Sequence, residues 1–398
     1  MLASLALILL CGLGLGAVFK KLRLPGLIGM LLTGIALGPF ALNLLDASVL
    51  SISAELRRIA LVIILARAGL SLDVEDLKKI GRPAVLMSFV PACFEMAGTV
   101  LLAPRLLGLN LLDSALLAAV VASASPAVIV PRMLHLMDNG YGTDKRIPQM
   151  ILAGDSVDDV FNIVVFSALL GITKGETVTA ARFATVPVSI LSGAAVGVSA
   201  GLALSWLFKK AHMRDSAKIA VLLGIAFLLV ALEDRIGNVL PFSGLLAVMA
   251  AGVVLLRKLP IAAGRMSSKL SKLWVGAEVV LFVLVGASVN LQYTAFAGGK
   301  TILLLIGVLS ARAVGIGLCL LGTPLNRRER AFCMLTGIPK ATVQAAIGGI
   351  PLAMGLPCGE IILAVAVVSI LFTAPLGALL LDISHKRLLT KTGDSPNG

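Results

Sequence analysis

Apolar stretches of about the length of a transmembrane helix follow one another along nearly the whole chain of 398 residues. A helix needs about 20 apolar residues to cross the ~30 Å hydrocarbon core of a bilayer. Apolar residues make up 58% of the chain and charged residues only 14%, which is far from the composition of a soluble protein. The sequence therefore predicts an all-α, multi-pass membrane protein with about 13 transmembrane helices, at 2–19, 24–42, 56–72, 84–107, 112–135, 148–172, 183–208, 217–233, 241–257, 272–291, 300–321, 330–355 and 359–383.

The 34 Lys and Arg residues are distributed unevenly between alternate loops. If the N-terminus lies outside, 24 of them fall in the inside segments and seven in the outside segments. Cytoplasmic loops carry this excess in membrane proteins. We therefore expect a cytoplasmic C-terminus with a short basic tail at 385–398, and a bacterial inner membrane as the location. The net charge of +13 then reflects membrane topology, and no nucleic-acid partner is expected.

A weak internal repeat relates the two halves of the chain. The motif GLSLD at 69–73 resembles GASVN at 286–290, with an offset of 217 residues. This offset spans seven predicted helices, an odd number, so the two copies are inserted with opposite orientation. Inverted repeats are typical of secondary transporters, which bind their substrate near the membrane midplane where broken helices meet.

Prolines interrupt two of the predicted helices. Pro126 lies in the stretch 112–135, and Pro339 lies in the stretch 330–355, directly before Lys340. The backbone groups that a proline frees inside a membrane have to be satisfied by protein or by a wet cavity. The two prolines are 213 residues apart, close to the offset of the repeat. We therefore predict two crossing broken helices, with the charge of Lys340 near the crossover.

Acidic side chains lie in the middle of the apolar stretch 148–172. Asp155, Asp158, Asp159 and Asn162 have the spacing of one helix face. A single charge at the centre of a membrane helix costs ~2.5–3.5 kcal/mol, so three carboxylates indicate a function rather than a structural polar stripe. Two adjacent carboxylates in a low-dielectric site cannot both ionise cheaply. A cation and a proton would therefore compete for them, which is the chemistry of ion-for-proton exchange.

The ion site is predicted at the pair Asp158 and Asp159, with Na⁺ or Li⁺ as the bound metal ion. Oxygen atoms suit such a hard cation, so the hydroxyls near the two breaks are candidate secondary ligands. These are Ser123, Ser125 and Thr336. Asp155 and Asn162 are expected at the entrance of the site.

Glu95 and Arg312 are separated by 217 residues, the offset of the repeat, so they fall in equivalent helices. Each alone would be a costly buried charge, and a buried ion pair resolves both costs. Arg67 and Glu278 are also predicted inside helices, and we expect a structural or interface role for them.

The motifs of this chain resemble those of the cation/proton antiporter superfamily, and in particular the NHA clade of sodium/proton exchangers. The similar segments are SPAVIVP at 125–131, GYG at 140–142, SVDD at 156–159, IPKATVQAAIG at 338–348 and RAGLSLD at 67–73. The likeness extends from about residue 20 to about residue 380.

The resemblance implies a single membrane domain at 1–384 with two parts. A transport part would span about 84–172 and 300–383, and a dimerisation scaffold about 1–72 and 217–291, joined by a linker helix at about 183–208. Asp159 would be the indispensable carrier and Asp158 its partner. Members with paired aspartates often have a lysine where this chain has Arg312, which cannot release a proton. The resemblance also matches Glu95 to a glutamate of the clade.

The sequence therefore predicts a homodimeric secondary antiporter that exchanges Na⁺ or Li⁺ for H⁺ by elevator-type alternating access, with no cofactor and no enzymatic activity. Three alternatives stay open within transport: K⁺/H⁺ antiport, sodium-coupled symport of an organic anion, and a passive channel. An intramembrane aspartyl protease is a fourth alternative, although adjacent aspartates on one helix do not suit its geometry.

Overall fold

The computed structural model describes residues 1–22, 24–71, 81–173, 185–211, 213–236 and 242–391. Within these residues the secondary structure is helical, apart from one isolated bridge between Tyr141 and Lys391. In this described part, nine helices are long and apolar enough to cross a membrane. The prediction of an all-α, multi-pass membrane protein is confirmed. The count of thirteen spanning helices stays a prediction.

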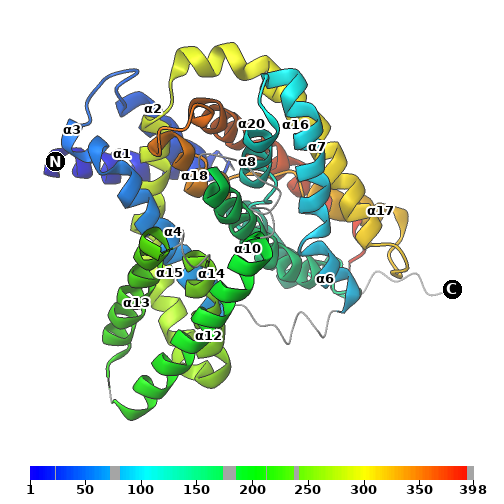
Figure 1. Ribbon diagram of the computed structural model, residues 1–398. Coiled ribbons are helices and arrows are strands. Elements are labelled where there is room, and N and C mark those ends of the chain that lie inside the picture. The colour runs from blue at the N-terminus through cyan, green and yellow to red at the C-terminus, as the bar shows by residue number, and fades with distance from the viewer. Residues whose placement is uncertain (23, 72–80, 174–184, 212, 237–241, 392–398) are drawn as a thin grey trace. The chain divides into compact units, whose positions relative to one another are not determined.

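The chain divides into two compact units. Unit 1 comprises residues 1–50, 74–162 and 282–398, and unit 2 comprises residues 51–73 and 163–281. Figure 1 shows the succession of the helices along the chain. Two long helices contribute to both units, namely α10 (Ile147–Thr173) and α15 (Pro260–Ala287).

Unit 1 begins with the helices α1 (Leu2–Lys21), α2 (Gly26–Leu37) and α3 (Ala47–Ser51). They are followed by α6 (Arg82–Met87), α7 (Val90–Leu107), α8 (Leu111–Val121), α9 (Pro126–Asp138) and the first part of α10. After the end of α15 come α16 (Leu291–Cys319), α17 (Arg327–Leu335), α18 (Thr342–Ile347), α19 (Ile350–Ala353) and α20 (Gly359–Leu388).

Unit 2 contains α4 (Ser53–Ser71), α12 (Thr185–Lys210), α13 (Asp215–Ile236) and α14 (Gly244–Lys258), with the remaining parts of α10 and α15. Its helices approach closely through small residues, as is common between membrane helices. A Cβ atom at Gly252 would lie 2.8 Å from the backbone of Gly69, so α4 and α14 touch through their backbones there. Arg67 and Glu278 both belong to this unit, and their predicted role is untested.

Helix ends in unit 1 follow the local sequence. The side chain of Asn110 accepts a hydrogen bond from the backbone N–H of Asp113 and caps α8. Asn326 and Glu329 form a capping box at the start of α17. The predicted helix 84–107 is divided into α6 and α7 at residues 88–89, because Pro91 favours the first turn of a new helix.

The predicted basic tail at 385–398 begins inside α20, which continues to Leu388. Cations are favoured in the last turn of a helix, and His385, Lys386 and Arg387 occupy that turn. Residues 392–398 lie outside the described part, as do residues 72–73 of the first repeat motif.

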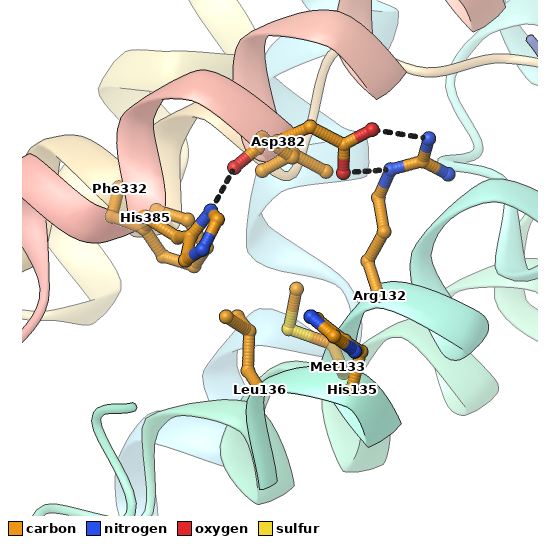
Figure 2. A pocket seen from close by; sticks show the side chains of 8 residues that line it. Arg132, Met133, His135, Leu136, Phe332, Asp382 and His385 are labelled. Atoms are coloured by element: carbon orange, nitrogen blue, oxygen red, sulfur yellow. Dashed lines mark hydrogen bonds and ion pairs between the residues drawn. The ribbon is translucent and has the colours of Figure 1, made fainter. Parts of the chain in front are cut away.

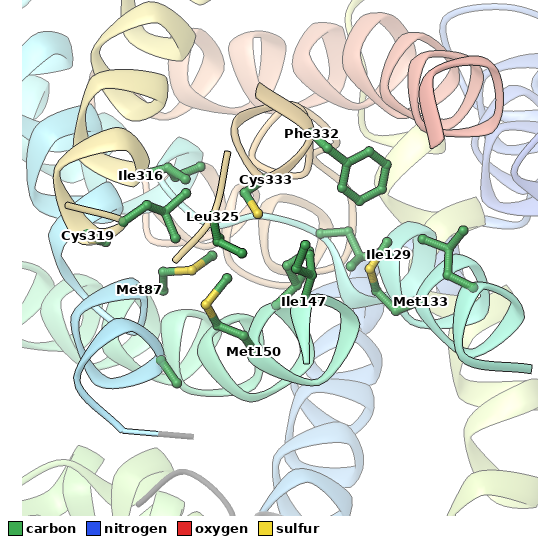
Figure 3. Close-up of a cluster of buried hydrophobic side chains, with 14 of the residues drawn as sticks. Met87, Ile129, Met133, Ile147, Met150, Ile316, Cys319, Leu325, Phe332 and Cys333 are labelled. Carbon is green, nitrogen blue, oxygen red and sulfur yellow. The ribbon is translucent and has the colours of Figure 1, made fainter. Parts of the chain in front are cut away.

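An apolar cluster in unit 1 holds the two broken helices against their neighbours. Figure 3 shows it built from α6, α9, α10, α16 and α17. Phe332 and Cys333 of α17 are completely buried in it, beside Ile129 and Met133 of α9 and Ile147 of α10. The backbone breaks are thus anchored by ordinary hydrophobic packing.

Candidate functional site

Two helix breaks meet in unit 1. Residues 122–125 separate α8 from α9, and residues 336–341 separate α17 from α18. The backbone N–H of Ser125 in the first break donates to the carbonyl of Pro339 in the second, at 2.9 Å. Because neither group belongs to a helix, this bond satisfies two of the backbone groups that the interruptions free. The two predicted breaks therefore cross.

The two prolines have different positions in these breaks. Pro126 is the first residue of α9, where its missing N–H costs nothing, and its fixed φ suits the helix start. Pro131 lies inside α9 and does not end it. Pro339 belongs to neither α17 nor α18.

Gln344 of α18 also spans the crossover. Its Nε2 atom donates to the carbonyl of Ser123 at 3.0 Å, with the carbonyl of Val121 at 3.4 Å. The end of α8 leaves such carbonyls without helical partners. The side chain of Gln344 is fully buried. Its amide, which belongs to the second broken helix, therefore caps the C-terminal end of α8 in the first.

Asp158 of α10 is held in place by two donors. Its Oδ2 atom lies 2.7 Å from Nη2 of Arg312 and 3.2 Å from the backbone N of Ala124 in the first break. Its side chain is fully buried. The Oδ1 atom has no hydrogen-bond partner among the described residues. The carboxylate is thus fixed on one side and unsatisfied on the other.

Asp159 has a different environment from its neighbour. Its Oδ1 atom accepts a hydrogen bond from the hydroxyl of Ser123 in the first break. Its side chain is partly exposed. Within the described part of the chain, no Lys or Arg side chain forms an ion pair with it.

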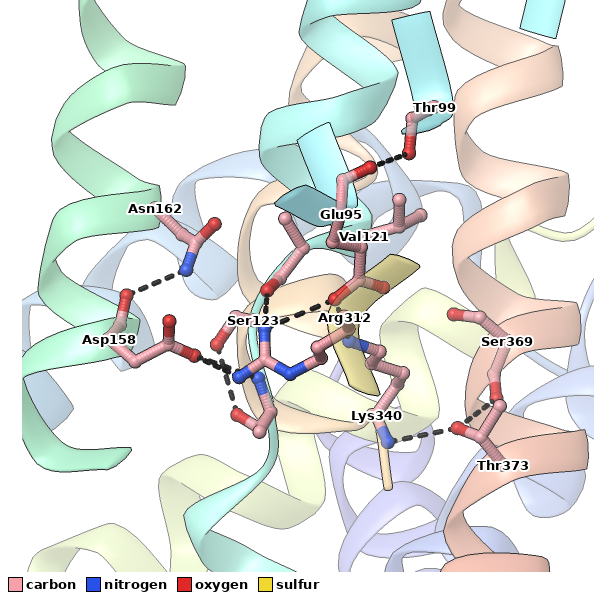
Figure 4. Close-up of polar contacts among 12 residues, drawn as sticks. Glu95, Thr99, Val121, Ser123, Asp158, Asn162, Arg312, Lys340, Ser369 and Thr373 are labelled. Atoms are coloured by element: carbon pink, nitrogen blue, oxygen red, sulfur yellow. Dashed lines mark hydrogen bonds and ion pairs between the residues drawn. The ribbon is translucent and has the colours of Figure 1, made fainter. Parts of the chain in front are cut away.

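Arg312 of α16 connects three groups. Its Nη1 atom lies 3.1 Å from Oε2 of Glu95 on α7 and also donates to the carbonyl of Ala122 at the end of α8, and Nη2 binds Asp158. Figure 4 shows its guanidinium between Glu95 and Asp158. The structure therefore brings the predicted partners Glu95 and Arg312 together and adds Asp158 to them.

Lys340 binds the same carboxylate oxygen. Its Nζ atom lies 2.7 Å from Oε2 of Glu95, and both side chains are completely buried. Its backbone N–H donates to the hydroxyl of Thr373 on α20, at 2.9 Å. Lys340 therefore neutralises a specific carboxylate as well as lying at the crossover, where it was predicted.

The other predicted residues take varied positions. Ser125 is fully buried, and its hydroxyl has no partner among the described residues. The hydroxyl of Thr336 donates to the carbonyl of Cys333 in the preceding turn, at 2.7 Å. Asp155 is 7% exposed and Asn162 is fully buried, so neither side chain opens to the surface. Their role at the entrance, like the ligand roles of Ser125 and Thr336, stays a prediction.

Two residues of the site were not predicted. Gln344 was part of the motif at 338–348, but no role was assigned to it. Thr373 is one of many small polar residues in the apolar helices, and nothing in the sequence distinguished it from the others. Gln344 lies in the first turn of α18, directly after the second break. An amide side chain next to a break can bind the backbone carbonyls that lack helical partners there, and this position is the signal that would have identified Gln344.

A pocket in unit 1 is lined by different residues. It lies between α9, α17 and α20, and Figure 2 shows Arg132 facing Asp382 beside it. Both nitrogen–oxygen distances of this bidentate pair are 2.9 Å. None of the carboxylates of α10 lines the pocket, so it is separate from the aspartate site.

The comparisons with known proteins agree on one family. The family model described as "Sodium/hydrogen exchanger, transmembrane" matches residues 5–383. The chain is 32% identical over 391 residues to human Sodium/hydrogen exchanger 9B2, with 92% of this chain and 70% of that protein covered. It is 29% identical over 388 residues to human Sodium/hydrogen exchanger 9B1, with 93% and 74% covered.

A solved structure has the same fold. It is the sodium proton antiporter MjNhaP1 from Methanocaldococcus jannaschii at pH 8, with a TM-score of 0.85 over 97% of this chain and 98% of that one. The sequence identity is 22%, so this likeness concerns the fold alone. The family match over nearly the whole chain places the protein among transporters rather than enzymes. The chain belongs to the sodium/hydrogen exchanger family of cation/proton antiporters.

Proposed function

We propose that this protein exchanges Na⁺ or Li⁺ for H⁺ at the Asp158–Asp159 pair, with Asp159 as the carboxylate that the two ions occupy in turn. The difference between the two aspartates carries the proposal. Asp158 is bound to Arg312 at 2.7 Å, whereas no cationic side chain in the described residues pairs with Asp159. An ionised carboxylate without a partner is costly in a low-dielectric site, so a transported cation or a proton is needed to neutralise it.

Ser123 suits either ion at Asp159. A serine hydroxyl has one proton to donate and two lone pairs to offer, and it can rotate between these roles. It donates to the carboxylate of Asp159 as the structure has it. When a cation binds, the same oxygen can turn a lone pair toward it, as a hard cation prefers.

Arg312 and Lys340 keep the rest of the site at constant charge. Arg312 stays protonated under all physiological conditions, and it binds both Glu95 and Asp158. Lys340 is held on Glu95. The two positive charges of Arg312 and Lys340 cancel the two negative charges of Glu95 and Asp158. The negative charge of Asp159 is therefore left for the transported ion to neutralise.

We further propose elevator-type alternating access in a homodimer, with an external N-terminus and a cytoplasmic C-terminus in a bacterial inner membrane. The excess of Lys and Arg in alternate loops supports this orientation. The likeness of the motifs to those of the NHA clade supports the dimer and the division into a transport part and a scaffold. Cross-linking of the protein in native membranes tests the dimer, and labelling of single loop cysteines from each side tests the orientation.

Purified protein in proteoliposomes tests the exchange. An outward Na⁺ gradient should drive H⁺ inward, and the flux should saturate with Na⁺. Asp159→Asn preserves the shape of the side chain and should reduce this flux to that of empty liposomes. Glu360→Gln is the matched control, because Glu360 is an exposed acid at the start of α20. Flux at the parent rate in Asp159→Asn would show that the site is assigned to the wrong residue.

The same liposomes separate the alternative functions. Replacing Na⁺ by Li⁺ and then by K⁺ distinguishes a sodium or lithium exchanger from K⁺/H⁺ antiport. Flux that needs an organic anion would indicate a symporter. Flux that does not saturate and ignores the counter-ion would indicate a channel. The family relationship excludes the protease alternative.

A further inference from the structure

Gln344 is a fully buried amide of α18 that the proposed exchange does not use. The two carbonyls near its Nε2 atom can only accept hydrogen bonds, so the amide directs its donors toward them and its Oε1 atom away. That Oε1 atom has no hydrogen-bond partner among the described residues. A buried oxygen without a partner is costly. An apolar side chain of similar length would fill the same space without this cost, so packing alone does not explain the amide.

The closer of its two contacts holds one peptide unit of the first break. The carbonyl of Ser123 accepts from Nε2 of Gln344 at 3.0 Å. The N–H of the same peptide unit belongs to Ala124, and its nitrogen lies 3.2 Å from Oδ2 of Asp158. Because a peptide unit is planar, contacts at its carbonyl and at its N–H fix its orientation. Gln344 therefore determines how this peptide unit meets Asp158.

The next peptide unit is also held by the second broken helix. It joins the carbonyl of Ala124 to the N–H of Ser125, and this N–H donates to the carbonyl of Pro339 at 2.9 Å. The residues between α8 and α9 lack the regular backbone hydrogen bonds that fix a helix, and their polar groups have to find other partners. The contacts from Gln344 and Pro339 therefore determine the shape of the first break.

The hydroxyl of Ser123 depends on this shape. Its Oγ atom has two acceptors within reach, namely Oδ1 of Asp159 and, at 3.0 Å, the carbonyl of Ala124. A hydroxyl has one proton and can rotate to donate it to either acceptor. When it donates to the carbonyl, its lone pairs are free for a hard cation on Asp159. This change of acceptor requires that both stay within reach of Oγ, and the peptide unit that Gln344 holds sets that reach.

We propose that Gln344 is a positioning residue that sets the affinity of the site for its cation, through Ser123 rather than by contact with the ion. It holds the peptide unit of Ser123 and Ala124 and thereby places the hydroxyl between its two acceptors. This inference rests on the proposed function, because it requires that the cation binds at Asp159 with Ser123 as a ligand. The second broken helix then contributes to cation binding through a side chain that is not itself a ligand.

The Na⁺ dependence of H⁺ flux in proteoliposomes tests the effect on affinity. Gln344→Met removes the donors and keeps the length of the side chain. The KM for Na⁺ should rise about five- to tenfold, which corresponds to the loss of one hydrogen bond. The maximal rate should change much less. A loss of folded protein would instead lower the maximal rate and leave the KM unchanged, and an unchanged KM in Gln344→Met would overturn the proposal.

Asn110→Ala is the matched control, because it weakens the other end of α8. Oδ1 of Asn110 accepts a hydrogen bond from the N–H of Asp113 at 2.8 Å, and losing such a cap destabilises a helix. This variant should leave the KM for Na⁺ unchanged. A rise equal to that of Gln344→Met would overturn the proposal, because any weakening of α8 would then have the same effect. Should Gln344→Met fail to fold, Gln344→Asn takes its place with the same expected rise in KM, since its amide is too short to reach.

Hydrogen–deuterium exchange tests the contact without transport. Gln344→Met should speed deuterium uptake at the backbone N–H groups of Ala124 and Ser125, which both donate in the first break, and Asn110→Ala should not. Uptake at the parent rate in Gln344→Met would overturn the proposal, because the amide would then not hold the break. If the parent moves no H⁺ in response to Na⁺, the proposed function itself is wrong, and deuterium uptake still decides whether Gln344 holds the break.

Discussion

Replacing Glu95 by glutamine removes the negative charge that two buried cations share. Its Oε2 atom lies 2.7 Å from Nζ of Lys340 and 3.1 Å from Nη1 of Arg312. Arg312 retains Asp158 in the variant, but no other carboxylate in the described residues forms an ion pair with Lys340. Breaking a buried pair by removing one partner costs ~3–5 kcal/mol. Because a whole domain is stable by only ~5–15 kcal/mol, Glu95→Gln should be strongly destabilised.

The assay is the temperature at which half of the detergent-solubilised protein remains monodisperse. Glu95→Gln should lower this temperature clearly, and Glu360→Gln, which removes an exposed acid, should not. Adding Lys340→Met to Glu95→Gln removes the unpaired cation, so the double variant should recover part of the loss. If Glu95→Gln unfolds at the parent temperature, or if Lys340→Met simply adds a second loss, the shared ion pair does not stabilise the site as argued.

Two further variants test contacts around the crossover. A Cβ atom at Gly377 of α20 would lie 2.8 Å from Cδ of Pro339. Gly377→Ala should therefore displace the second break and reduce the exchange rate in proteoliposomes at least severalfold. Gly14→Ala is the control and should leave the rate unchanged, because nothing lies within 4 Å of a Cβ atom there. Lys145 lies 2.8 Å from the fully buried carboxylate of Glu329, and leaving that carboxylate without this partner costs about 1–3 kcal/mol of stability. Lys145→Met should therefore lower the temperature measured in the same thermal assay. Glu329→Gln should restore part of that loss, and no recovery would argue against the pair.

Local periodicity was sufficient to find the acidic face of α10. The positions of Asp155, Asp158 and Asn162 follow from 3.6 residues per turn, so the sequence alone places them on one side of the helix. The structure adds which of the aspartates is bound to a cation. That distinction depends on Arg312, 154 residues away in the sequence, and helical periodicity carries no information at this range.

The internal repeat predicted one contact between residues far apart in the sequence, the pair Glu95 and Arg312. Because Glu95 and Arg312 are one repeat length apart, they fall in equivalent helices, and in the structure these helices, α7 and α16, lie side by side with the two side chains in contact. The division of the stretch 84–107 at residues 88–89 was missed, although Pro91 was visible. Proline restricts the chain in the first turn of a helix as well as in its interior, and only the tertiary structure shows which of the two applies.

The crossover shows why some partners cannot be read from a sequence. Lys340 was expected to place its charge near the crossover, but its partner was not predicted, and its ammonium group binds Glu95, 245 residues away in the sequence. The carbonyls at the end of α8 accept hydrogen bonds from Gln344 and Arg312, which belong to other helices. A break frees backbone groups at a place that the sequence predicts, but the donors that satisfy them come from whichever helices cross there. Each buried polar group needs a hydrogen-bond partner, and the packing of the surrounding helices decides which donor or acceptor it obtains.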